Sequence, residues 1–138
     1  MKVSLVPEEF AISIWPQVRG HLARAAAETN GRYNEADVLD LITDYHYLLW
    51  IAFDESDIKG AVVTCFNEYP RKKYLHLMFC GGDEGMTWKN EMLATLRSWA
   101  KDNDCDGIEG FGRLGWERIF RDDGYTPSLR SFELPLGN

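Results

Sequence analysis

The stretch from Leu75 to Ala100 decides the fold of this chain. It reads LHLMFC at 75–80, GGDEG at 81–85 and MTWKNEMLATLRSWA at 86–100. The first segment predicts a β-strand, the second a glycine-rich turn, and the third an amphipathic helix from Trp88 to Ala100. This order presents backbone N–H groups at the positive end of a helix dipole, so it predicts a site for a phosphate-bearing ligand.

Two acidic residues of the same turn oppose such a ligand. At an exposed site, the charges of Asp83 and Glu84 each disfavour an anion by about 1 kcal/mol at low salt. The alternative interpretation is an ordinary connection between a strand and a helix, in which the glycines only provide conformational freedom.

Composition favours one domain covering residues 1–138. The chain is 45% hydrophobic and 13% aromatic, which is enough to fill one core. Its net charge is −7, so nucleic acid is not expected as a partner. No apolar run approaches the roughly 20 residues of a membrane span, and no secretory signal is evident at the N-terminus. We therefore expect a cytoplasmic protein.

The three cysteines, Cys65, Cys80 and Cys105, are widely spaced and odd in number. This pattern is typical neither of a metal site nor of a disulfide framework. We expect buried free thiols in a reducing compartment, and no bound metal.

The N-terminal half predicts one strand and two helices. The strand covers residues 1–6, and the first helix starts at 7–9 and ends at the Asn-Gly pair 30–31. Pro16 predicts a kink or break just before it. Asn34 is a candidate N-cap of the second helix.

The remaining segments predict an antiparallel meander, the helix described above and three further elements. The meander strands are expected at 47–53, 58–66 and 74–80, and the last elements are a strand at 107–111, a helix at 116–121 and a strand at 128–134. The complete order is β-α-α-β-β-β-α-β-α-β.

This order, with a glycine turn between the fourth strand and the third helix, resembles the GNAT superfamily of N-acetyltransferases. The resemblance implies an α+β fold, with a mixed, largely antiparallel twisted sheet flanked by helices, and acetyl-CoA as a ligand. In that family, the turn usually reads Arg or Gln, two residues, Gly, one residue, then Gly or Ala. Gly81, Gly82 and Gly85 supply glycines here, but no Arg or Gln precedes them.

A second family signature can be laid on Gly124-Tyr125. It places Arg113 at the position of an asparagine, Trp116 at that of an alanine and Phe120 at that of a tyrosine. In the family, this tyrosine often protonates the departing thiolate. Phe120 has no ionisable proton, so the chain lacks the usual acid at this position.

The resemblance also implies how acetyl-CoA would bind. Backbone N–H groups of residues 82–87 would hold the pyrophosphate, and the edge of strand 77–80 would pair with the pantetheine amides in a V-shaped gap between the fourth and fifth strands. The candidate binding residues are Phe79, Cys80, Gly81, Gly82, Gly85, Met86, Thr87, Arg113 and Phe120. Arg113 either binds an anion or forms an ion pair with a carboxylate such as Asp122 or Glu117.

Two strand residues are candidates for the general base that an amine acceptor requires. They are Glu109 on the fifth strand and His76 on the fourth. The alternatives are a solvent-facing carboxylate for Glu109 and a hydrogen-bonded or surface imidazole for His76.

The segment GRLGW at 112–116, followed by Gly124-Tyr125, is similar to small GNAT-like proteins of tailed bacteriophages, some of which are internal virion or assembly proteins. Two hypotheses follow. In the first, the acetyl-CoA site is degenerate and the chain is a binding or virion assembly protein, with a protein partner or self-association. In the second, it is an acetyl-CoA-dependent N-acetyltransferase. The missing Arg or Gln, the missing tyrosine and the acidic turn favour the first.

Overall fold

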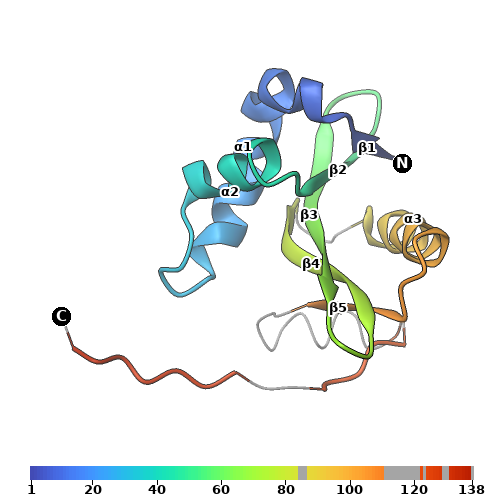
Figure 1. Cartoon of the computed structure of the whole chain (residues 1–138). Coiled ribbons are helices and arrows are strands. Elements are labelled where there is room, and N and C mark those ends of the chain that lie inside the picture. Colours follow the sequence, from blue (N-terminus) through green and yellow to red (C-terminus); the bar gives the residue numbers. More distant parts are fainter. Residues whose placement is uncertain (84–86, 111–121, 123, 129–130, 138) are drawn as a thin grey trace.

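The computed structural model describes residues 1–83, 87–110, 122, 124–128 and 131–137. Its centre is a five-stranded sheet, with helices on both faces (Figure 1). The elements are β1 (Lys2–Val6), the 3₁₀ turn η1 (Glu8–Phe10), α1 (Ala11–Ala27), α2 (Glu35–Thr43), β2 (Leu48–Phe53), β3 (Ile58–Glu68), β4 (Lys73–Gly82), α3 (Lys89–Asp102) and β5 (Gly107–Gly110).

The sheet is mixed and largely antiparallel, as the sequence predicts. Its strands lie in the order β1-β2-β3-β4-β5, so each strand is next to its neighbour in sequence. The pairs from β1 to β4 are antiparallel, and β4 pairs with β5 in parallel. Helix α3 supplies the crossover that a parallel pair requires.

A β-bulge divides β4 into two parts. Val63 pairs with Phe79 and the next residue, Thr64, pairs with Leu77, so Met78 is the extra residue. Before the bulge, Leu75 and Leu77 belong to the core beneath α3, whereas Phe79 belongs to the core beneath α1. The bulge therefore changes which face each later side chain occupies.

Two cores lie on opposite faces of the sheet. One contains Val18 and Leu22 of α1 together with residues of α2, β2, β3 and β4. The other contains Met92 and Leu96 of α3 packed on the opposite sides of the same strands. Strands β2 to β4 contribute to both, which explains their long runs of buried residues.

The sequence predicts a kink or a break at Pro16, and the structure excludes the break. Helix α1 is continuous through this proline, so the expected break is absent. Pro16 lies in the second turn and removes one backbone donor, while the burial of Val18 and Leu22 stabilises the turns that follow. The start of α2 is confirmed: Asn34 Oδ1 accepts from Asp37 N at 2.9 Å, and Asp37 returns the bond to Asn34 N.

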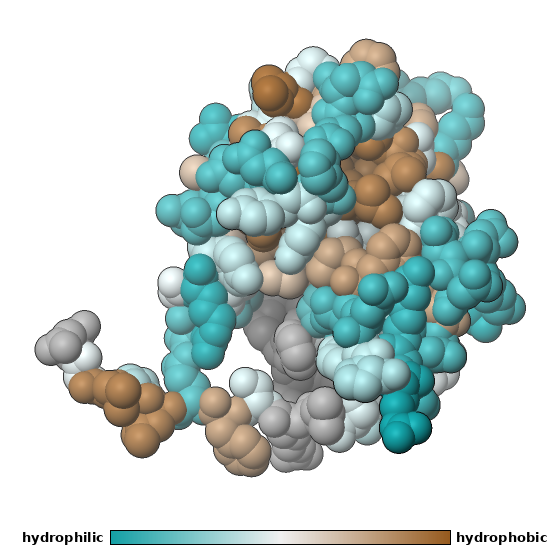
Figure 2. Space-filling view, in the orientation of Figure 1, coloured by the Kyte–Doolittle hydropathy of each residue, from teal (hydrophilic) through white to brown (hydrophobic). Residues whose placement is uncertain are grey.

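The predicted last strand, 128–134, is wrong for the residues that the structure describes. Ser128 and residues 131–134 belong to no strand, and the tail runs in extended form away from the sheet (Figures 1 and 2). Its alternating apolar residues give a strand-like pattern, but no neighbouring strand pairs with them among the described residues. The predicted helix 116–121 lies outside the described residues.

Two predictions from composition can be compared with the structure. All three cysteines are free, and each is half-buried rather than fully buried. No helix among the described residues is long and apolar enough to cross a membrane.

Candidate functional site

The parallel pair β4–β5 brings the two candidate bases together. His76 and Glu109 are register partners, so their side chains leave the same face of the sheet. His76 Nδ1 lies 3.1 Å from Glu109 Oε2. The imidazole is almost completely buried, with 4% of its side chain exposed, while the carboxylate is 21% exposed and lies nearer to solvent.

The same carboxylate oxygen accepts a second bond. Tyr69, in the turn between β3 and β4, donates its hydroxyl hydrogen to Glu109 Oε2 at 3.0 Å. This bond raises the pKa of the Tyr69 phenol, and partial desolvation adds to the effect, because a neighbouring carboxylate disfavours the phenolate. Tyr69, Glu109 and His76 therefore form one hydrogen-bonded cluster that runs from the surface to the sheet interior.

This cluster determines which ring nitrogen of His76 carries hydrogen. An ionised carboxylate can only accept hydrogen bonds, so Nδ1 of His76 must be the donor to Glu109. In the neutral ring, Nε2 then carries the lone pair. A histidine oriented in this way by a carboxylate has the arrangement of a general base held in place by a second group.

The nearby thiols are poor nucleophiles. Cys65 is the register partner of His76 on β3, and burial raises its pKa, with the charge of Glu109 acting in the same direction. Burial raises the pKa of Cys80 to about 12. Both residues are therefore protonated near neutral pH, which does not favour a covalent acyl-thiol mechanism.

The glycines that the sequence assigns to a turn are in fact strand residues. Gly81 and Gly82 end β4, where they pair with Ala61 and Gly60. A Cβ on Gly81 would collide with the backbone oxygen of His21 in α1. Both residues thus permit close packing of the helices, and the prediction of a turn at 81–82 is wrong because the strand extends past Cys80.

Trp88 explains the other glycine contacts. Its buried indole covers the cross-strand pair Gly60 and Gly82, and a Cβ on Gly82 would lie 2.5 Å from Trp88 Cζ2. This packing brings the start of α3 close to the end of β4. Among the described residues, the indole Nε1 of Trp88 has no hydrogen-bond partner.

Basic side chains lie beside the acidic turn. Lys59 Nζ is 3.0 Å from Asp57 Oδ1 and 3.9 Å from Asp83 Oδ2. Arg24 of α1 donates to Gly82 O at 3.5 Å and lies 2.8 Å from His21 Nδ1. The charge of Asp83 is thus partly compensated by Lys59, which is distant in sequence.

Helix α3 begins without a capping bond from the side chain of its N-cap residue. Trp88 is the N-cap residue, and its side chain makes no capping bond. Thr87 precedes it and is exposed. The start of this 14-residue helix lies at the positive end of its dipole, where an anion is favoured.

Among the described residues, the register between β4 and β5 covers only the first half of β4. Leu77 and Gly110 are the last register partners that the structure describes, and β4 continues to Gly82. Residues 111–121 are outside the described part of the chain, so the predicted V-shaped gap remains a prediction.

The described residues line two hollows on the α3 side of the sheet. A cavity of about 10 Å³ between α3 and β4 is lined in part by Leu77, Cys80 and Trp88, and it has room for one water molecule. An open depression of about 420 Å³ lies between β2 and α3, and it is lined by Trp50, Ala94, Thr95, Ser98, Trp99 and Asp102. His76 and Glu109 line neither hollow.

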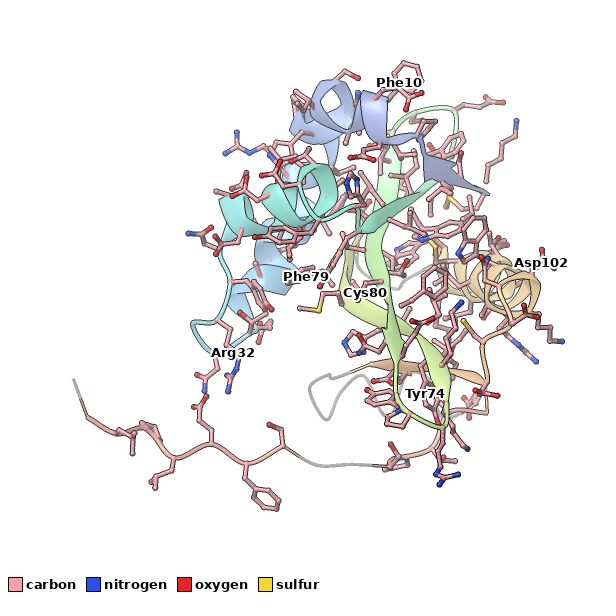
Figure 3. All side chains as sticks on the ribbon, in the orientation of Figure 1. Phe10, Arg32, Tyr74, Phe79, Cys80 and Asp102 are labelled. Atoms are coloured by element: carbon pink, nitrogen blue, oxygen red, sulfur yellow. The ribbon has the colours of Figure 1, made fainter. Side chains whose placement is uncertain are left out.

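The candidate binding residues that the structure describes lie in two places. Phe79 and Cys80 follow the bulge on β4 and contribute to opposite cores (Figure 3). Gly81, Gly82 and Thr87 lie at the junction of β4 and α3. The other candidates, Gly85, Met86, Arg113 and Phe120, lie outside the described residues, as do Glu84, Trp116 and Glu117.

Sequence reasoning missed Tyr69, Arg24 and Lys59 as neighbours of the candidate site. Tyr69 lies in a polar hairpin turn, and its proximity to Glu109 depends on the β4–β5 crossover. Arg24 and Lys59 come from α1 and β3. A prediction of the strand register would have placed His76 opposite Glu109, but no local pattern marks the other three.

The fold is that of the GNAT acetyltransferases: a mixed five-stranded sheet with α1 and α2 on one face and α3 on the other. Among solved structures, it is similar to a ribosomal-protein-alanine N-acetyltransferase from Brucella melitensis biovar Abortus 2308. The two share 12% identity over 99% of this chain and 100% of that chain, with a TM-score of 0.71.

Two further structures have the same fold. A GNAT family acetyltransferase from Staphylococcus aureus shares 14% identity over 98% of both chains, with a TM-score of 0.66. An acetyltransferase from Trypanosoma brucei shares 14% identity over 98% of this chain and 99% of that chain, with a TM-score of 0.69. No family model matches the sequence. No curated protein matches it either.

Proposed function

We propose that this protein is an acyl-CoA-dependent N-acyltransferase in which His76 is the general base and Glu109 orients it. The observation that carries the proposal is the bond between His76 Nδ1 and Glu109 Oε2 across the parallel β4–β5 pair. The pair lies just before the bulge of β4, in a fold shared with acetyltransferases.

Acetyl-CoA would be the acyl donor, held at the positive end of the α3 dipole and along β4 after Leu77. The proposed reaction forms a bond between the acceptor nitrogen and the acyl carbon, and it breaks the bond from that carbon to sulfur. His76 Nε2 takes the proton that the amine loses, and Glu109 stabilises the resulting imidazolium. The departing thiolate takes a proton from solvent, because Phe120 has none to give.

The first experiment measures acetyl-CoA binding by thermal denaturation. A ligand that binds the folded chain raises its melting temperature in proportion to occupancy. We expect a rise with millimolar acetyl-CoA in the wild type and in His76→Gln. The absence of any shift in the wild type would rule out the proposed enzyme.

The second experiment measures the release of free CoA thiol with polyamines and short peptides as acceptors. His76→Gln should lower turnover by about 10²–10⁴-fold, the usual contribution of a general base. His46→Gln is the matched control, since His46 is an exposed histidine paired with Glu8. Equal activity of the wild type and His76→Gln would refute the assignment of the base.

A second candidate function is binding or assembly without catalysis, as the phage-like segment 112–116 suggests. The packing of Gly81 and Gly82 against α1 and Trp88 favours it, because these glycines serve the fold rather than an open cradle. This alternative predicts a stable complex with another protein or copy, and no acetyl-CoA shift. Isolation of a monomer that turns over acetyl-CoA would exclude it.

A further inference from the structure

The C-terminal tail has the properties of a β-strand that lacks a sheet. Phe132, Leu134 and Leu136 alternate along it, and they are 93%, 81% and 90% exposed. No backbone hydrogen bond of the described structure involves residues 131–137. Figure 2 shows the apolar residues of the tail standing clear of the body of the molecule. An exposed segment with these features can pair with a sheet edge.

Weak polar contacts join Glu133 of the tail to the connection between α1 and α2. Glu133 forms an ion pair with Arg32 of the α1–α2 connection at 2.7 Å, and Figure 3 shows Arg32 reaching toward the tail. Asn30 also donates to Glu133. Both partners of the ion pair are largely exposed, and such pairs contribute little stability. The Arg32–Glu133 contact therefore leaves the apolar side of the tail uncovered. It would also break at little cost in free energy if the tail moved.

The backbone of the tail has one edge suited to pairing. Pro135 lacks an N–H group, so it can occupy a strand only where its nitrogen faces away from the partner. The N–H groups of Phe132, Leu134 and Leu136 point to the opposite edge, because strand residues alternate. All three apolar residues can thus bond through the backbone to one neighbouring strand.

Strand β1 offers a matching edge. It pairs with β2 on one side, and within the described part of the chain no strand lies on its other side. Val3 and Leu5 are partly buried against the core beneath α3, whereas Lys2 and Ser4 are exposed. A strand added there could place its apolar residues beside Val3 and Leu5, and Glu133 on the side of Lys2.

The other edge strand fits less well. In the part of the chain that the structure describes, β5 has four residues, and two of them, Gly107 and Gly110, have no side chain for cross-strand contact. The tail leaves the molecule on the side away from β1 (Figure 1), so its own β1 is not its neighbour. We propose that residues 131–137 add as a strand to the β1 edge of a second copy of this chain.

This proposal is independent of the acyltransferase proposal, and the oligomeric state tests it. Size-exclusion chromatography with light scattering over a concentration series should give a mass of two copies or more, since closed symmetric assembly is the usual outcome. Leu134→Arg should give a monomer with an unchanged far-UV spectrum. Glu133→Gln, which removes the Arg32 pair but keeps the apolar side, should still associate.

Two measurements connect association to strand addition. Amide exchange at residues 131–137 and 2–6 should be slow in the assembly and become fast in Leu134→Arg. A peptide of residues 128–138 should dissociate the wild-type assembly, whereas a scrambled peptide should not. A wild-type monomer at all concentrations, an assembly unaffected by Leu134→Arg, or rapid exchange at 131–137 in the assembly would overturn the proposal.

Discussion

Individual residues of this protein show how glycine positions depend on their packing. Gly81 is a glycine because the backbone of α1 at His21 occupies the place of a side chain. Gly20 lies in the middle of α1, and a Cβ there would have no atom within 4 Å. The same residue type is therefore required at one position and dispensable at the other.

This contrast gives a matched pair of substitutions. Gly81→Ala should destabilise the fold by about 1–3 kcal/mol, because the added carbon forces α1 away from β4. Gly20→Ala should stabilise it by about 0.5–1 kcal/mol, because alanine restricts the unfolded chain and favours helix. Urea denaturation measures both, and a Gly81→Ala variant as stable as the wild type would contradict the close contact with His21.

At the scale of elements, the connections are held by short polar networks. The turn between β2 and β3 depends on Asp54, whose Oδ1 accepts from the backbone N–H groups of Ser56 at 2.8 Å and Asp57 at 3.1 Å. The Asp57 bond first, and the Ser56 bond second, lower the pKa of Asp54 below its usual value of 3.8. The ionised carboxylate is thus part of this hairpin.

The sign of the resulting pH dependence follows from the lowered pKa. The contribution of Asp54 to stability is present above the unfolded pKa and is lost as the pH falls through the folded one. Asp54→Ala should lower the melting temperature at neutral pH, and the difference from wild type should narrow below pH 3.8. Glu55→Ala, in the same turn, is the control. If the difference in melting temperature between Asp54→Ala and the wild type stayed constant below pH 3.8, ionisation of Asp54 would not contribute to the stability of the turn.

On the scale of the whole molecule, the two cores share the strands between them. Leu22 of α1 is buried in one core and Met92 of α3 in the other, and strands β2 to β4 separate the two. Loss of packing on one face therefore weakens the support of the other.

We expect both cores to unfold in one transition. Leu22→Ala and Met92→Ala should each lower the free energy of unfolding by about 2–5 kcal/mol, the usual loss for such buried side chains. Far-UV circular dichroism and tryptophan fluorescence should report the same midpoint in each variant. Separate midpoints for the two probes would indicate two independent units.

Much of this architecture is predictable from the sequence because it depends on local patterns. The meander, the capped start of α2 and the amphipathic α3 follow from alternation, an Asn-x-x-Asp pair and helical spacing. The predicted strand at 128–134 failed, since alternation cannot reveal whether a partner strand is present. The pairing of His76 with Glu109 depends on a crossover and a register, and the position of Tyr69 depends on a hairpin beside them.

The single extra residue at Met78 reverses the side-chain alternation of β4, so that odd- and even-numbered residues exchange faces of the sheet. Before Met78, the odd-numbered residues Leu75 and Leu77 face α3. After Met78, the even-numbered residues Cys80 and Gly82 lie on that face. Removing one residue here would move Phe79 and every position beyond it to the wrong helix layer. An engineer who swaps segments between this chain and a related sheet must therefore transplant the irregularity together with the side chains it directs.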